Sequence, residues 1–324
     1  MNALVTGGAG FIGRWVVEFL LADGHDVWVV DNFSNGRREN LARWESHPRL
    51  KVIAADINDA ALLGRLFARP GFDRCFHLAA NVNVQNSIDD PKGTFLGDLS
   101  GTATLLDAAR PTCTKIIFVS SCMVFDGAPP GGLCETSPLR PRSPYAAGKV
   151  AAEYLVQSYY YAYGMPVTVL RPFNTYGPFQ KVTAEGGVVA IFIQGLLNRQ
   201  PVRIFGDGRQ TRDFLYVEDC ARFIIAAGYS DRSNGEVIVA GTGQDVTIND
   251  LAHRILKDPS RIQHVPHIHP QAEIYKLLSN PKKAGELLGW KPTVFLEEGI
   301  RRTAEWIKQN MPACQTQGDD LCVF

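Results

Sequence analysis

The sequence predicts an α/β protein, with a doubly wound parallel sheet followed by a smaller α/β lobe toward the C-terminus. Three observations support this. Short apolar runs of strand length alternate with helical patterns over residues 1–174. A glycine-rich turn joins the first strand to the first helix, and the alternation loosens beyond 174. Strands that alternate with helices in this way build a parallel sheet with helices on both faces.

Length and composition restrict the class of protein. The chain has 324 residues, of which 45% are hydrophobic, so it can bury a large core. Lys plus Arg and Asp plus Glu are equal at 33 each, so no net charge recruits nucleic acid or an anionic membrane. We find no apolar run long enough to span a membrane and no basic leader. We therefore expect neither a nucleic-acid partner nor a membrane.

The seven cysteines are scattered, without a CxxC pair or the spacing of a metal site. An odd number of such cysteines is typical of free thiols in a reducing compartment. We expect a cytoplasmic protein without a disulfide framework and without a bound metal.

The first strand, at residues 3–5, leads into Gly7, Gly10 and Gly13, and a helix is predicted from Phe11 to Ala22. Glycines let the backbone approach a pyrophosphate, and the first N–H groups of the helix offer an anion site. The turn by itself indicates only a phosphorylated ligand, and an ordinary structural turn is the alternative.

The second strand, 25–31, ends in Asp31 followed by Asn32. A carboxylate at this position can accept hydrogen bonds from an adenosine ribose and would repel a 2′-phosphate, which favours NAD over NADP. A solvent-facing strand-end aspartate is the alternative, and Arg37 and Arg38 in the next loop weaken the preference for NAD slightly.

Further strands are predicted at 50–55, 75–78 and 115–120, and helices at 60–67 and 93–109, which completes a Rossmann-like half. Strand three ends in Asp56 and Ile57, where a carboxylate can reach an adenine amino group. Strand four ends in Ala79, Ala80 and Asn81, where small side chains would let a cofactor cross the strand ends; ordinary helix–sheet contacts are the alternative.

The remaining pattern predicts how the chain divides. A helix over 143–163 and a strand over 167–171 complete an NAD-binding domain, 1–174, to which 214–240 returns. Residues 175–213 and 241–311 form the smaller lobe, with helices at 186–198, 248–256, 281–288 and 296–310, and 312–324 is a tail.

Tyr145 and Lys149 lie one helical turn apart, so both project from one face of their helix. A phenol is a poor base at neutral pH, but a neighbouring ammonium, together with the positive nicotinamide ring of NAD, would favour its ionised form and make it a usable general base. Ser121, at the end of strand five, can hydrogen-bond the same substrate hydroxyl. An isolated YxxxK pair would more often be a solvated helix face, but the preceding phosphate turn reverses that preference.

With these residues in place, the chain resembles a known family: the extended short-chain dehydrogenase/reductases that act on nucleotide sugars. The resemblance extends from Gly7 to about Trp306. It rests on a combination of motifs: TGGAGFIG (6–13), HLAA (77–80), YAAGK (145–149), RPFNTYGP (171–178), GDGRQTRDFLYVED (206–219) and LLGWKP (287–292).

The resemblance implies catalytic, cofactor and substrate residues. Catalysis falls to Ser121, Tyr145 and Lys149. NAD would contact Gly7, Gly10, Phe11, Ile12, Asp31, Asn32, Asp56, Ile57, Leu78, Ala79, Ala80, Tyr145 and Lys149. The nucleotide sugar, a UDP-sugar by preference, would contact Ser121, Cys122, Met123, Asn174, Val188, Val202, Ile204, Arg212 and His269. A homodimer through 93–109 and 145–163 is implied as well.

Departures from the family pattern bear on the reaction. Cys122 and Met123 stand where the dehydratases carry an acid and a base, and methionine cannot abstract a proton. The sequence therefore favours an NAD-dependent 4-epimerase acting on a UDP-hexose, UDP-hexosamine or UDP-hexuronate. A dehydratase or 4-keto reductase and an NAD-binding sensor without turnover are the alternatives. We expect the Cys122 thiol to pack beside the sugar with an ordinary pKa.

Two further departures concern charge. The second arginine that often clamps the diphosphate is absent; a histidine of the 267–273 segment, or Lys276, would replace it, and a less tightly held diphosphate is the alternative. Asp98 stands where the family usually carries asparagine, and we expect it to change the local charge if it is buried near the cofactor.

Overall fold

A parallel sheet forms the larger half of the protein, with strands in the order β11-β6-β5-β4-β1-β2-β3 within the described part of the chain. The computed structural model describes residues 1–324 apart from 69–70, 83, 183–186, 268 and 311–324, so the expected tail, 312–324, lies outside the described residues. The strands are β1 (Asn2–Thr6), β2 (Asp26–Asp31), β3 (Leu50–Ala54), β4 (Arg74–His77), β5 (Lys115–Val119), β6 (Val167–Pro172) and β11 (Val237–Ala240).

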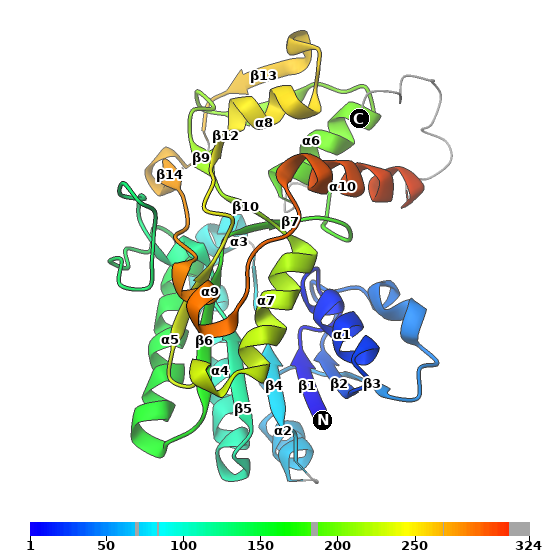
Figure 1. Cartoon of the computed structure of the whole chain (residues 1–324), viewed down its shortest axis with the longest axis vertical. Helices are drawn as coiled ribbons and strands as arrows, with labels where there is room; N and C mark the ends of the chain where they lie inside the picture. Colours follow the sequence, from blue (N-terminus) through cyan, green and yellow to red (C-terminus); the bar gives the residue numbers. More distant parts are fainter. Residues whose placement is uncertain (69–70, 83, 183–186, 268, 311–324) are drawn as a thin grey trace.

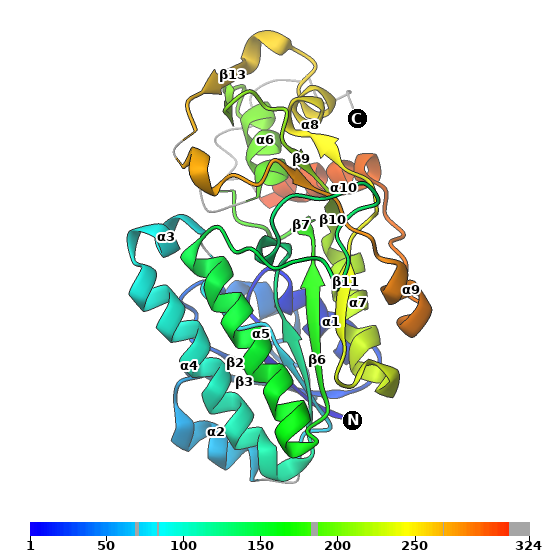
Figure 2. The ribbon, with the colours of Figure 1, turned by 90° about the vertical axis from the view of Figure 1, so that its left-hand side faces the viewer.

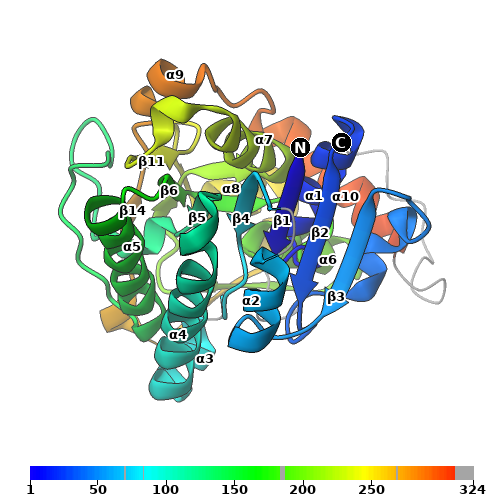
Figure 3. The same ribbon diagram turned by 90° about the horizontal axis from the view of Figure 1, so that it is seen from below.

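Helices cover both faces of this sheet, as expected for a doubly wound fold (Figures 1 and 3). On one face lie α2 (Ala60–Phe67), α4 (Pro91–Ala109) and α5 (Pro144–Tyr163), and on the other α1 (Gly13–Ala22) and α7 (Val217–Tyr229). Separate apolar clusters fill the two interfaces, one around Val17 and Phe223, the other around Leu105 and Val156. The carboxyl ends of the strands point toward the second half of the molecule (Figure 2).

The second half is a lobe of short strands and helices above the sheet (Figure 1). Its strands form small sheets: β10 (Phe214–Tyr216) with β7 (Asn174–Tyr176), β13 (Ile262–Val265) with β8 (Val202–Phe205), and β9 (Thr211–Arg212) between β12 (Val246–Thr247) and β14 (Lys276–Leu277). The helices α6 (Val188–Leu197), α8 (Ile248–Ile255) and α10 (Leu296–Asn310) share an apolar core with β8 and β10.

The chain passes between the two halves more than once. After the first lobe segments it enters α7 and then β11, which pairs with β6 at the edge of the main sheet. It returns to the lobe through β12 and α8, and α9 (Lys282–Leu288) then packs beside α7 and β11 before α10.

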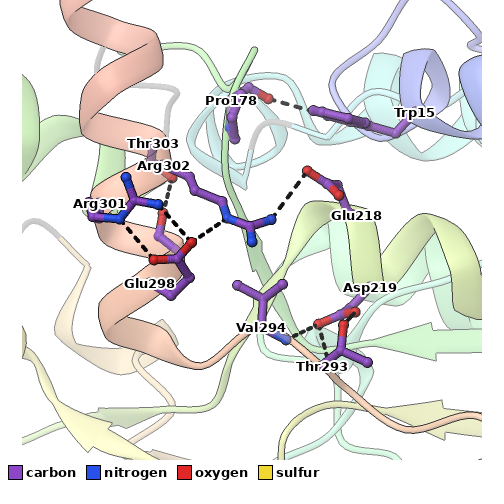
Figure 4. A network of polar contacts seen from close by, with 11 residues as sticks. Trp15, Pro178, Glu218, Asp219, Thr293, Val294, Glu298, Arg301, Arg302 and Thr303 are labelled. Atoms are coloured by element: carbon purple, nitrogen blue, oxygen red, sulfur yellow. Dashed lines mark hydrogen bonds and ion pairs between the residues drawn. The ribbon is translucent and has the colours of Figure 1, made fainter.

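Side-chain contacts join the halves where α7 begins (Figure 4). The buried Asp219 carboxylate accepts hydrogen bonds from the backbone amides of Thr293 (2.8 Å) and Val294 (2.9 Å). Arg302 of α10 donates to Glu298 (2.7 Å) and lies 4.0 Å from Glu218. Because these groups come from distant parts of the sequence, they fix the segment that leads into α10.

Several boundaries differ from the prediction. The first helix begins at Gly13 rather than Phe11, because residues 7–12 remain in a turn in which the Gly10 amide donates to the Gly7 carbonyl (3.0 Å). A short helix, α3 (Val84–Asp89), precedes α4, and the short strands β7, β9, β12 and β14 were not predicted. They are too short to show a period in the sequence.

Candidate active site

The glycine turn is held tightly between β4 and α1. Gly7 has a φ of +70°, and a Cβ there would lie 2.7 Å from the backbone nitrogen of Ala79. A Cβ on Gly13 would collide with the carbonyl oxygen of Gly7. Only glycine permits both approaches, so the turn packs backbone against backbone at Gly7 and Gly13.

Carboxylates from the next two strands lie beside this turn. The Asp31 carboxylate at the end of β2 accepts hydrogen bonds from the amides of Ala9 (2.9 Å) and Phe33 (2.8 Å). The Asn32 side chain donates to Asp56 (2.8 Å), whose pKa is lowered by hydrogen bonds from Asn58. The predicted acids of strands two and three therefore lie along one edge of the sheet, where Asn32 follows Asp31 and donates to Asp56.

The residues after β4 continue this edge. Leu78 and Ala79 donate their amides to Thr6, at its carbonyl (3.1 Å) and its hydroxyl (3.3 Å), and Leu78, Ala79 and Ala80 are half-buried. The Ile57 side chain lies against Gly101 of α4, where a Cβ would collide with it. The Ile57 side chain therefore packs against α4, directly after the cofactor-edge residue Asp56.

Tyr145 and Lys149 project from the first turns of α5 into the interior. The helix begins with Pro144, and the Ser143 hydroxyl caps it by accepting from the Ala146 amide (3.2 Å). Tyr145 is 7% exposed and Lys149 4% exposed. The Lys149 ammonium donates to the Val119 carbonyl of β5 (3.3 Å) and lies 5.2 Å from the centre of the Phe118 ring.

Ser121 reaches the same place from the end of β5. Its hydroxyl accepts from the Met123 amide (3.2 Å) and contacts the Tyr145 phenol. Burial raises the pKa of Tyr145, and the Ser121 hydrogen bond only partly opposes that rise. The sequence predicts that Lys149 and a positive nicotinamide ring together favour the phenolate, and burial of Tyr145 acts in the opposite direction on its pKa.

A buried histidine, His77, lies close to Lys149 and joins β1 to α4. His77 at the end of β4 contacts the hydroxyls of Thr6 (2.7 Å) and Thr102 (3.1 Å). Burial, with Lys149 as a second cause, lowers its pKa to about 3, so the ring is neutral. The HLAA motif carried this residue, but nothing in the sequence showed that it links β1 to α4.

Cys122 and Met123 form the wall that follows Ser121. The Cys122 sulfur lies 3.9 Å from the Asn174 side-chain oxygen at the start of β7. Burial raises the pKa of the Cys122 thiol to about 12, whereas an ordinary pKa was expected, so the thiol stays protonated. A protonated thiol and a thioether give this wall no acid or base of useful pKa.

Arg212 lies on the short strand β9, and its partners come from the segment that precedes β14. Its guanidinium donates to the Ile274 carbonyl (2.8 Å) and is paired with the Glu273 carboxylate. The other oxygen of Glu273 lies 2.6 Å from the His267 ring. The neighbouring Asp213 is buried, and its carboxylate accepts hydrogen bonds from Thr242, Gly243 and Ser279.

The expected replacements for the missing arginine lie in different places. His269 contacts Gln85 of α3 (2.9 Å), which links the lobe to the larger half, while Lys276 lies 3.8 Å from Asp245. Of the described candidates in this segment, His267 is joined to Arg212, through Glu273. The missing arginine directed attention to this segment of the sequence, but it did not indicate that Glu273 joins His267 to Arg212.

Val202 and Ile204 share one face of β8, but that face is inside the lobe core, where they are 3% and 1% exposed. The lobe core covers both side chains, and their contact with the nucleotide sugar stays a prediction. Val188, the first residue of α6, is half-buried against the same core.

Two further searches concern the described residues only. Within them, no three His, Cys, Asp or Glu side chains gather as a metal site would require. None of their helices is long and apolar enough to cross a membrane.

A glycine turn at the first βα junction, acids after the next two strands, and a buried Tyr–Lys pair beside a serine define the class: a short-chain dehydrogenase/reductase of the extended type. Comparisons with known proteins agree. The family described as GDP-mannose 4,6 dehydratase matches residues 4–303. The UDP-glucose 4-epimerase of Mycolicibacterium smegmatis is 39% identical over 312 residues, 95% of this chain and 99% of that protein.

Solved structures support the same assignment. The X-ray structure of Pal from Bacillus thuringiensis is 55% identical, with a TM-score of 0.94 over 95% of this chain and 99% of that one. The Thermus thermophilus UDP-glucose 4-epimerase complex with NAD is 34% identical, with a TM-score of 0.86 over 96% of this chain and 100% of that one. The relatives also include nucleotide-sugar dehydratases and decarboxylases. The chain belongs to this family of nucleotide-sugar epimerases and dehydratases.

Proposed function

We propose that the protein is an NAD-dependent 4-epimerase of a nucleotide sugar, with a UDP-sugar as substrate. The observation that carries the proposal is the wall at Ser121, Cys122 and Met123: it presents a hydroxyl to Tyr145 but no acid or base to act elsewhere on the sugar. Relatives named as 4-epimerases of UDP-glucose and UDP-glucuronate support it.

The residues fit NAD as the cofactor. The glycine turn is packed so closely that a Cβ on Gly7 or Gly13 would collide with neighbouring backbone, and the N-terminus of α1 that follows it suits a pyrophosphate. The Asp31 carboxylate is suited to ribose hydroxyls and unsuited to a 2′-phosphate, and Lys149 supplies a positive charge beside Tyr145. When bound, NAD supplies a nicotinamide that takes a hydride from the sugar and returns it.

The chain's own part is acid–base and positional. Tyr145 takes the proton of the sugar's 4-hydroxyl, Ser121 holds the same oxygen, and Lys149 stabilises the phenolate. Arg212 holds the diphosphate through its forked donors. Because Cys122 stays protonated and Met123 cannot ionise, a 4-keto sugar meets no base that would eliminate water, and it returns to either 4-epimer.

The test is to incubate the NAD-loaded protein separately with UDP-glucose, UDP-GlcNAc and UDP-glucuronate, and to follow the products by NMR and mass spectrometry. We expect the 4-epimer of at least one substrate, with unchanged mass. Tyr145→Phe should lower kcat about 10³-fold while the fold, measured by circular dichroism, is kept.

Other outcomes would overturn the proposal in a recognisable way. A product lighter by one water would assign a dehydratase, and net consumption of reduced cofactor would assign a 4-keto reductase. A Tyr145→Phe protein that behaves like the parent in every sugar assay would leave only an NAD-binding sensor.

We also propose that the protein is a homodimer formed through α4 and α5. Large apolar side chains on the outer surface of these adjacent helices support it: Leu96 is 50% exposed, Tyr154 62% and Tyr161 77%. Light scattering during gel filtration should give twice the mass of one chain. The double variant Leu96→Asp, Tyr154→Asp should give the mass of a single chain.

The cytoplasm is the compartment we propose. Its support is chemical: the described cysteines, at 75, 113, 122, 134 and 220, are all free thiols.

A further inference from the structure

Asp98 of α4 lies beside the buried lysine of α5. The two helices run side by side (Figure 2), and they meet where Gly148 faces Phe95: a Cβ on Gly148 would lie 3.6 Å from the Phe95 ring. Asp98 follows Phe95 by nearly one helical turn, and Lys149 follows Gly148 directly. The contact between Gly148 and Phe95 therefore brings the α5 segment that carries Lys149 next to the α4 segment that carries Asp98, and each charge acts on the other.

The Asp98 carboxylate is fixed from a second direction. It accepts a hydrogen bond from the Asn81 amide (2.8 Å), in the segment that continues β4 along the cofactor edge. The Asp98 carbonyl accepts from Thr102, whose hydroxyl also contacts His77 (3.1 Å). The Asn81 amide therefore holds the half-buried Asp98 carboxylate at the cofactor edge.

Lys149 needs a counter-ion. Its described hydrogen-bond acceptor is a neutral carbonyl, that of Val119, and its other close neighbours are aromatic rings. A buried ammonium without an opposite charge tends to lose its proton. Glu153 also attracts the ammonium, but its carboxylate is already engaged by the Arg171 guanidinium through hydrogen bonds of 3.0 and 2.6 Å.

We propose that Asp98 is a positioning residue that keeps Lys149 charged, so that Lys149 can stabilise the ionised form of Tyr145 during proton transfer. The inference rests on the proposed function for its role in turnover. A neutral asparagine at this position would hold the Asn81 amide equally well but would supply no charge.

The charge balance around the pair supports this assignment. Burial lowers the pKa of Lys149 and raises that of Asp98, while each of the two opposes the shift of the other. The groups that face them from other elements do not titrate near neutrality: His77 of β4 has a pKa of about 3 and the Cys122 thiol one of about 12. Glu153 of α5 stays paired with Arg171.

The direct test measures Lys149 itself. In the NAD-loaded protein with ¹³C-labelled lysine, the Lys149 resonance is assigned by its loss in Lys149→Met and titrated with pH. Removing a negative charge lowers the pKa of every neighbouring group, so Asp98→Asn should lower the pKa of Lys149 by about one unit. Asp98→Glu keeps the charge and should restore most of the shift.

A second readout is the pH profile of kcat/KM. The acid limb of the profile should follow the Tyr145 phenol and the alkaline limb the Lys149 ammonium. Both limbs should move to lower pH in Asp98→Asn, because Asp98 raises the pKa of both groups. Asp107→Asn is the matched control: Asp107 lies on the same helix but accepts a hydrogen bond from Tyr159 (2.7 Å), away from the site.

An unchanged Lys149 pKa in a folded Asp98→Asn protein, or an equal shift in Asp107→Asn, would overturn the inference. Absence of turnover with every sugar, while the NMR shift is present, would count against the proposed function alone. Circular dichroism confirms that each variant is folded.

Discussion

The cofactor half and the substrate lobe hold their functional groups by different means. In the cofactor half, the groups follow from backbone packing: Gly7 against Ala79, Gly13 against Gly7, and Asp31 on the Ala9 amide. In the lobe, Arg212 is held by Glu273, a side chain from a distant part of the chain. A rigid backbone site tolerates no added atom, whereas a site of paired side chains can exchange partners when a ligand arrives.

The largest effect should come from adding one carbon to the rigid half. Gly13→Ala places a methyl group against the Gly7 carbonyl, and backbone on both sides cannot move aside. We expect a loss of about 3 kcal/mol in the free energy of unfolding. NAD affinity should fall at least tenfold. Chemical denaturation and calorimetric titration measure the two quantities.

Gly10→Ala is the control for this change. A Cβ there would lie 3.1 Å from the Gly7 oxygen, a tight contact that a small shift relieves. A Gly13→Ala protein no less stable than Gly10→Ala would show that the turn is not rigid.

An intermediate effect is expected at the exchangeable pair. Arg212→Met removes the forked donor for a diphosphate, so KM for the nucleotide sugar should rise about 10- to 100-fold with a smaller change in kcat. Arg209→Met, an exposed arginine close by in the same segment, should leave KM nearly unchanged. A large fall in kcat with constant KM would instead place Arg212 in the chemistry.

The smallest effect is expected at the junction of the two halves. Arg302 and Glu218 are partly exposed and 4.0 Å apart (Figure 4), so Arg302→Met should cost about 0.5 kcal/mol of unfolding free energy. The loss should shrink in high salt, because screening already weakens such a pair. A loss above about 2 kcal/mol would show that this junction is as rigid as the glycine turn.

The same contrast explains what the sequence could predict. The sheet and its long helices followed from apolar periods, and α2, β11 and α10 have the predicted bounds. Short strands such as β9 and β14 carry no period of their own and form because they pair with each other. In the site, Tyr145, Lys149 and Ser121 share a local motif or a strand end, and the structure brings them together.

Residues that act through distant partners could not be predicted. Nothing near Glu273 in the sequence indicates that it meets both Arg212 and His267. Val202 and Ile204 alternated as a strand should, but the alternation does not say which face the lobe covers. The high pKa of Tyr145 follows from burial, which depends on the packing of the whole site.

Because the chain passes repeatedly between sheet and lobe, neither half corresponds to one continuous stretch of sequence that could be expressed separately. Because β11 completes the edge of the sheet and α9 packs against it, a fragment ending before 237 would leave β6 with an open edge. An open edge strand invites pairing with other chains. Neither half is therefore a module that could be expressed, exchanged or fused by a single cut, and a chimera must carry both sets of crossing segments together.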